Sequence, residues 1–319
     1  MAYRIKIGEY SLSLLDQLTI RKSITSLEDS ATIVVPAYYH NRTFNIEENV
    51  KVGDAVSIKI GYGTKEEHLK EEFVGYVDKL TTEGGNITIE CLDAMYLLKH
   101  KEMENGEHKN ITVKSLLQKV ADACGLAGVS SEYEFTYSKF TIHNATAYVV
   151  LKKLQEEAKA DVYIKDNVLH FNAPYSKVLN EGEPVLYDFA RNIESSDLKY
   201  KNESDSRLQI ELTYTDSNGK KVKKTFGKEG GEKKTFKAGT VNTAEMEEKA
   251  KQIYDRYCFT GYEGGFTGWL LPYVEPTMSV KLNDSEYPDK NGVYYVAGTE
   301  VEFSSSGGRR KITLGRRLS

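Results

Sequence analysis

The same succession of short β-type segments occurs twice in this chain, once near each end. Each copy has a Ser-x-Lys-x segment, a second apolar segment downstream, and a Gly-Gly pair that precedes a third segment. The matched segments of the first and second copies are 57–60 with 279–282, 73–77 with 294–298, and Gly84-Gly85 plus 87–89 with Gly307-Gly308 plus 312–314. Three short matches can also arise by chance between β-rich segments. The shared order and nearly constant offset favour a duplicated β module split by an insertion.

Alternation of apolar and polar residues predicts strands in both outer thirds of the chain. The strands predicted in this way are 31–36, 55–60, 73–77, 86–91, 207–214, 278–282 and 293–297. Short strands separated by Gly-rich turns, such as the one at 83–86, are typical of a small barrel or sandwich.

The middle of the chain changes to helical spacing. Apolar residues recur every three or four positions after Thr112, which can serve as N-cap, up to Gly125, which can end the helix. A second apolar stripe of the same kind follows Thr146. Residues 162–171 then alternate on both sides of an Asp166-Asn167 pair, which predicts a hairpin.

These patterns predict a mainly β protein with an α+β insert, in which two similar tube-like antiparallel β-barrel modules flank a small α+β domain. Residues 1–100 form the first barrel, 101–180 the insert and 181–319 the second barrel. The second barrel carries one helix at about 243–257, where Asn242 begins a capping box. At 319 residues the chain is long enough for each part to have its own core.

Charge and hydropathy exclude several classes of function. A formal net charge of -4 argues against specific nucleic-acid recognition, which needs a basic face. No apolar run approaches the roughly 20 residues that span a bilayer, so we expect no membrane insertion by this chain. The N-terminus has no apolar core of a signal peptide, which predicts synthesis in the cytoplasm. The three cysteines, Cys91, Cys124 and Cys258, are too far apart to predict a zinc site or a disulfide framework.

No catalytic motif is present in the sequence. It has no G-x-S-x-G elbow, no H-E-x-x-H pair and no phosphate loop, and its six histidines are scattered. The glycine-rich stretch 261–268 follows a predicted helix and leads into a strand, which is the reverse of a phosphate-binding loop. We therefore expect no enzymatic activity, no catalytic residues, no cofactor and no metal site. The 22 tyrosines suit half-buried strands, surfaces that meet partners, or both.

Two basic clusters are candidate interface residues. Arg309, Arg310, Arg316 and Arg317 lie close together near residue 319, and Lys223 and Lys224 belong to a lysine-rich arm at 220–237. Arginine is favoured at interfaces because its guanidinium group makes several directed hydrogen bonds. The alternative is a solvated strand edge, since lysine in particular discourages unwanted strand pairing.

Segments 272–282, 291–296 and 303–314 together resemble the last strands of the late-control-D tail-hub family. The Asn-Gly-Val-Tyr-Tyr-Val and Phe-Ser-Ser-Ser-Gly-Gly motifs carry this resemblance, and the α+β insert is also similar. The family includes phage baseplate hubs and the N-terminal part of VgrG proteins. The resemblance implies a homotrimer in which each chain supplies two tube-like barrels.

In such a family a trimer with six barrels adapts a hexameric tail tube to a threefold spike. The resemblance therefore implies as partners a second and third copy of this chain, the tail tube protein, a separate spike protein and other baseplate proteins. It also implies a place in a virion tail or an injection machine made in bacterial cytoplasm. The alternative is a tail-associated protein that binds carbohydrate or the cell wall through exposed tyrosines.

Overall fold

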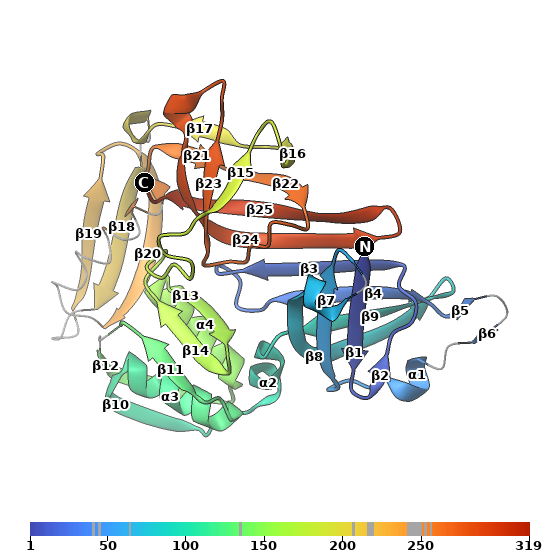
Figure 1. Cartoon of the computed structure of the whole chain (residues 1–319). Helices are drawn as coiled ribbons and strands as arrows, with labels where there is room; N and C mark the ends of the chain where they lie inside the picture. The colour runs from blue at the N-terminus through green and yellow to red at the C-terminus, as the bar shows by residue number, and fades with distance from the viewer. Residues whose placement is uncertain are drawn as a thin grey trace.

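The computed structural model describes residues 1–39, 42–43, 46–63, 65–133, 136–205, 208–215, 220–240, 251, 254–255 and 257–319. The predicted helix at about 243–257 falls almost entirely outside these residues. The described chain is mainly β, with few helices, as the sequence predicts (Figure 1). No helix in its described part is long and apolar enough to cross a membrane.

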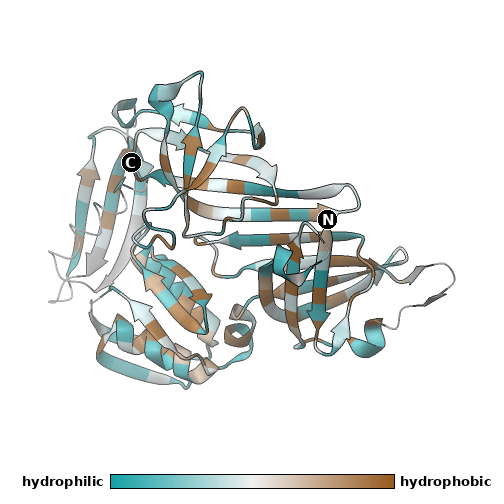
Figure 2. Ribbon diagram, viewed as in Figure 1, coloured by the Kyte–Doolittle hydropathy of each residue, from teal (hydrophilic) through white to brown (hydrophobic). Residues whose placement is uncertain are grey.

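The first β unit is antiparallel throughout, and its strands alternate between buried and exposed positions. Its strands are β1 (Ala2–Ile7), β2 (Tyr10–Ser11), β3 (Gln17–Ser23), β4 (Ser30–Pro36), β7 (Ala55–Gly61), β8 (Leu69–Glu83) and β9 (Asn86–Leu92). Smaller elements are β5 (Tyr38–Tyr39), β6 (Arg42–Thr43), α1 (Ile46–Asn49) and the 3-10 turn η1 (Glu66–His68). In β4, every second residue is buried, and bands of apolar colour cross the unit in Figure 2. This period of two directs one face of each strand into the core.

The second β unit is built from strands that come before and after the lysine-rich arm. Its strands are β15 (Val185–Asp188), β16 (Ile193–Ser196), β22 (Gly265–Trp269), β23 (Ser279–Asn283), β24 (Gly292–Ser304) and β25 (Gly307–Arg317). Beside them lie β17 (Lys199–Lys201), η2 (Glu203–Asp205), β21 (Gly261–Glu263) and η3 (Pro288–Lys290). Its core is rich in aromatic residues, with Tyr187, Phe266 and Tyr294 fully buried.

The two β units repeat the same five strands in the same spatial order. In the first unit the order is β3-β4-β9-β8-β7, and in the second it is β16-β22-β25-β24-β23. The strands also follow one another in the same order along the chain. All the pairings within each set are antiparallel. The duplication that the sequence suggests is therefore a duplication of topology.

The predicted equivalence of the Gly84-Gly85 and Gly307-Gly308 pairs is wrong. Gly84 and Gly85 form the turn between β8 and β9, but the equivalent turn between β24 and β25 is made by Ser305 and Ser306. Gly307 and Gly308 already belong to β25. A side chain on Gly308 would begin 2.6 Å from the side chain of Leu270, so this glycine serves close packing and not the turn.

The middle unit has an α+β fold. Its elements are α2 (Met95–His100), β10 (Gly106–Thr112), α3 (Val113–Cys124), β11 (Gly128–Ser131), β12 (Thr136–Ile142), α4 (Ala147–Ala158), β13 (Asp161–Lys165) and β14 (Val168–Asn172). The predicted caps are confirmed: Thr112 and Thr146 accept backbone N–H groups at the starts of α3 and α4, and Gly125 ends α3 in the left-handed region. The Asp166-Asn167 turn is confirmed as well, with both residues at positive φ.

A further sheet, formed by β18 (Leu208–Thr215), β19 (Lys221–Gly227) and β20 (Glu232–Thr240), packs on the middle unit. Leu208, Ile210 and Leu212 are buried in the same core as α3 and α4. Strand β20 is the one that lies against β12 and α4 of the middle unit (Figure 1). The sequence-based division places residues 208–240 in the third domain, whereas their apolar side chains complete the core of the second.

A glycine in β8 permits the close approach of β8 to β9. A methyl group added to Gly75 would lie 2.1 Å from the carbonyl oxygen of Leu92, so the backbone would have to shift. We expect Gly75→Ala to lower the free energy of unfolding by about 1–3 kcal/mol in urea titrations. Gly128→Ala is the matched control, because nothing lies within 4 Å of its added methyl group. Equal effects of the two substitutions would contradict this account of Gly75.

Candidate assembly site at the junction of the units

The two β units are joined edge to edge by β3 and β24. These strands pair antiparallel over seven residues, from Gln17 opposite Ser304 to Ser23 opposite Gly298. The pairing makes one continuous sheet of the two units (Figure 1). Val301 and Phe303 of β24 are buried in the core of the first unit. Backbone hydrogen bonds and shared apolar burial therefore fix the two units to each other.

A cross-strand ion pair lies on the solvent side of this joint. Arg21 of β3 donates a hydrogen bond from Nε to Oε2 of Glu300 at 2.7 Å. The two residues are directly opposite each other in the register of the pairing. Opposite charges at such positions favour one register over its neighbours.

A buried ion pair ties the units together beneath the sheet. Arg310 of β25 donates from Nη2 to Oε1 of Glu72 at 2.5 Å and from Nη1 to Oε2 at 3.1 Å. The same guanidinium group donates to the carbonyl oxygens of Val274 and Leu270, at 3.1 and 3.3 Å. The side chains of Arg310 and Glu72 are only 1% and 3% exposed. Bidentate pairing and the added carbonyls compensate for the loss of water around the two charges.

A bulge in β8 directs Glu72 toward Arg310. Ile58 of β7 pairs with Phe73 and Lys59 pairs with Glu71, so Glu72 is an extra residue between two successive pairs. An extra residue of this kind turns a side chain away from the direction that simple alternation would give it. The bulge explains how a carboxylate in a strand of the first unit reaches an arginine of the second.

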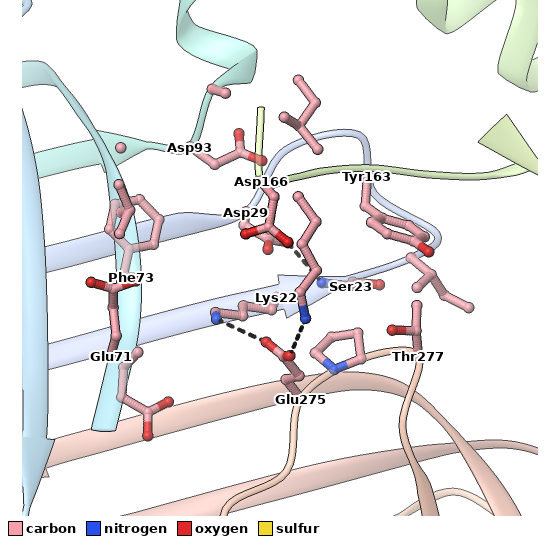
Figure 3. A pocket seen from close by; sticks show the side chains of 18 of the residues that line it. Lys22, Ser23, Asp29, Glu71, Phe73, Asp93, Tyr163, Asp166, Glu275 and Thr277 are labelled. Carbon is pink, nitrogen blue, oxygen red and sulfur yellow. Dashed lines mark hydrogen bonds and ion pairs between the residues drawn. The ribbon is translucent and has the colours of Figure 1, made fainter. Parts of the chain in front are cut away.

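A second ionic cluster links all three units. Glu275, which follows β22, accepts a hydrogen bond from Lys165 of the middle unit at 2.7 Å and lies 3.9 Å from the ammonium of Lys22 in β3. Tyr273 donates a hydrogen bond to the same carboxylate. Burial alone would raise the pKa of Glu275, but the Lys165 hydrogen bond and the Lys22 charge outweigh it, so its net pKa is lowered. Figure 3 shows Lys22 and Glu275 meeting in this way.

This cluster borders a cleft of about 480 Å³ where the three units meet (Figure 3). Its lining residues come from β3, from β8, from the β13–β14 turn and from the segment that follows β22. Among the charged lining residues, acidic ones outnumber basic ones, and they include Asp29, Glu71, Asp93 and Asp166. The described lining includes no histidine and no cysteine. Within the part of the chain that the structure describes, no three His, Cys, Asp or Glu side chains form a group that could hold a metal ion.

Two aspartates of the cleft have raised pKa values. Burial raises the pKa of Asp29 to about 6, although the Lys22 charge and the Ser23 N–H, which donates to Asp29 at 3.0 Å, oppose the rise. The pKa of Asp93 is also well above its ordinary range, because of burial first and the neighbouring Asp29 second. The two carboxyl groups therefore hold protons at a higher pH than exposed aspartates do.

The structure separates the basic residues that the sequence groups together. Arg310 is buried inside the chain, so it is not part of the surface of a single copy. Arg309 is 41% exposed, pairs with Glu194 of β16 at 2.6 and 2.9 Å, and lies over Trp269. Arg317 donates to the carbonyl oxygen of Asn291. Arg316 lies on β25 with these three arginines, and the other predicted interface residues, Lys223 and Lys224, lie on β19.

Sequence reasoning missed Glu72, Glu275, Lys22 and Asp29. Their only local signal is weak: Glu72 stands in a charged run just before the apolar middle of β8, where strand alternation does not mark it as buried. The oppositely charged partners of Glu72, Glu275 and Lys22 lie 100 or more positions away, whereas Asp29 accepts a hydrogen bond from the nearby Ser23.

The sequence matches no protein-family model and no curated protein. Solved structures with this fold are found among tail proteins. A tail protein of Neisseria meningitidis aligns over 99% of this chain and 97% of its own, with a TM-score of 0.68 at 14% identity. A 43 kDa tail protein of a Shewanella oneidensis prophage aligns over 98% and 97%, with a TM-score of 0.67 at 15% identity.

A third similar structure is a component of the type VI secretion system of E. coli, described as structurally similar to T4 tail proteins. The alignment covers 99% of this chain and 77% of that protein. The TM-score is 0.60 at 9% identity. At such identities the likeness shows the fold alone. The prediction of a mainly β fold of the kind found in tail proteins is thus confirmed.

Removing one partner of the buried ion pair should be costly. We expect Arg310→Met to lower the free energy of unfolding by about 3–5 kcal/mol, because Glu72 would be left buried without its counter-charge. Arg310→Met combined with Glu72→Gln should recover part of that loss. Arg309→Met is the control, since its pair with Glu194 is open to water and should change stability little. Additive losses in the double variant would show that the pair is not a unit.

The raised pKa of Asp29 predicts a pH dependence of stability. Between the ordinary aspartate pKa and about 6, the folded chain holds a proton that the unfolded chain releases. The free energy of unfolding should therefore decrease as pH rises through this window. Asp29→Asn, which keeps an oxygen for the Ser23 N–H, should lessen the decrease in denaturation curves taken at several pH values. Asp166→Asn, an exposed change on the same cleft, should leave it as in the wild type.

Proposed function

We propose that this chain is a hub subunit of a phage tail or a related injection machine, in which three copies form a ring between the tail tube and a threefold spike. The observation that carries this proposal is the repeated five-strand unit, joined to its second copy by β3 and β24. A chain with two equivalent units can present six similar positions when three copies assemble. It can therefore meet a sixfold ring on one side and a threefold object on the other.

The comparisons support this proposal through the fold. The similar structures are tail proteins and a type VI secretion component, and the alignments span nearly all of this chain. The chemistry of the junction supports it too. Its charged groups bind one another and hold the three units together, as a structural part requires.

On this proposal the partners are two further copies of the chain, the tail tube protein, a separate spike protein and other baseplate proteins. Arg309, Arg316 and Arg317, with Lys223 and Lys224 of the lysine-rich sheet, are the candidate residues for contacts with these partners. Arg310 acts within the chain. The protein would be made in bacterial cytoplasm and would act as a component of the assembled particle, in a structural and not a catalytic role.

The mass of the purified protein in solution tests the proposal. Light scattering should give about three times the chain mass of 36.0 kDa. Averaged electron-microscope views of that species should show a ring with six lobes around a central hole. Since assembly can depend on a partner, the measurement should be repeated with the neighbouring tail proteins present. A chain that stays monomeric in both cases would refute the ring.

A further inference from the structure

The internal repeat identifies a pair of strand edges that a single copy leaves open. In the second unit, β24 is a branching strand. One edge pairs with β25, whereas the other edge pairs with β23 over its first part and with β3 of the first unit over its last part. In the first unit, β8 occupies the position of β24, with β9 on one edge and β7 along the first part of the other.

The last part of β8 has no strand beside it on that other edge. β7 reaches only to Tyr76, and Val77 makes backbone hydrogen bonds with residues 53 and 54. From Asp78 to Glu83, β9 is the only strand of the described chain that pairs with β8. The Thr82 hydroxyl donates a hydrogen bond to Glu47 of α1, but no described strand occupies this edge, and an edge without a strand can accept one.

The strand that corresponds to β3 also has an open edge. β16 is the first of the five repeated strands in the second unit, as β3 is in the first, and it ends the continuous sheet. One edge of β16 pairs with β22, and no strand in the described residues covers the other. Its residues Glu194, Ser195 and Ser196 are exposed.

The register of the joint inside the chain can be transferred to these two edges. The two hairpins end in the equivalent pairs Ser304 with Gly307 and Glu83 with Asn86. Counting four residues back from Ser304 and from Glu83 makes Glu300 equivalent to Lys79. Arg21 lies opposite Ser30 of β4, and the residue of β22 equivalent to Ser30 is Gly265. The backbone N–H of Asp197, just past β16, donates a hydrogen bond to the carbonyl oxygen of Gly265. Arg21 is thus equivalent to Asp197.

The positions equivalent to the ion pair within the chain carry the opposite charges, so two copies can form the same pair with its charges exchanged. Arg21 and Glu300 form the pair across the internal joint. At the equivalent positions Asp197 supplies the negative charge and Lys79 the positive one. Both side chains are exposed: Lys79 makes no ion pair with any described residue, and Asp197 holds only a long 3.4 Å contact with Lys311 besides its backbone hydrogen bond. In the same register, Ser196 would face Leu80 and Ser195 would face Thr81.

We propose that β16 of one copy pairs antiparallel with the last part of β8 in the next copy, with Asp197 opposite Lys79. The occupant of the open β8 edge is a second copy of this chain, because only that occupant reproduces the internal joint with complementary charge. Each copy offers one β8 edge and one β16 edge, so the contact is head-to-tail and closes only as a ring. This inference rests on the proposed ring and names the surfaces that would form it.

Disulfide trapping tests the pairing directly. Residues opposite each other in neighbouring strands lie within the Cα separation that a disulfide needs. Under a mild oxidant, the Lys79→Cys/Asp197→Cys double variant should give covalent dimers and trimers on a non-reducing gel, and nothing larger. A second double variant, Thr81→Cys/Ser195→Cys, is two pairs along in the same register and avoids the Asp197 hydrogen bond. It should give the same products.

The control is Glu71→Cys/Asp197→Cys, in which the new cysteine on β8 lies beside β7, where the edge is already occupied. This variant and the wild-type chain, with its three native cysteines, should stay uncrosslinked. Light scattering of each sample under reducing conditions is measured in parallel. A trimer in which neither test pair crosslinks would overturn the β8–β16 pairing and leave the proposed function standing. Monomers under every condition would overturn both, and a ladder beyond trimer would show the pairing without a closed ring.

Discussion

The pairing of β3 with β24 is the contact on which the rest of this structure depends. It makes the two β units one sheet, and it places β25 close enough to β8 for Arg310 to meet Glu72. The buried charges are costly to desolvate, and only the correct register of the joint satisfies both of them. The backbone pairing supplies attraction, and the ion pair makes alternative registers unfavourable.

The middle unit is anchored to this joint from the side. Lys165 at the end of β13 reaches Glu275, and Lys22 of β3 approaches the same carboxylate. Three units thus share one acidic group. In the cleft around it, burial raises the pKa values of Asp29 and Asp93.

Much of the fold could be predicted from local sequence. The helix caps at Thr112, Gly125 and Thr146 and the Asp166-Asn167 turn depend on neighbouring residues, and all of them are confirmed. The site could not be predicted in the same way. The partner of Arg310 is 238 positions away, and the bulge that aims Glu72 at it leaves no mark in the sequence. Likewise, residues 208–215 alternate as any strand would, and nothing local shows which core receives them.

The distance along the chain between the two halves of the joint has a consequence for the order of folding. Arg21 and Glu300, which face each other across it, are separated by 279 positions. During synthesis β3 leaves the ribosome long before β24 exists, so the first unit must wait with that edge unpaired. The middle unit, whose contacts are mostly nearer in sequence, can fold in the meantime. The sheet that carries both units is therefore completed only after β24 has been synthesised.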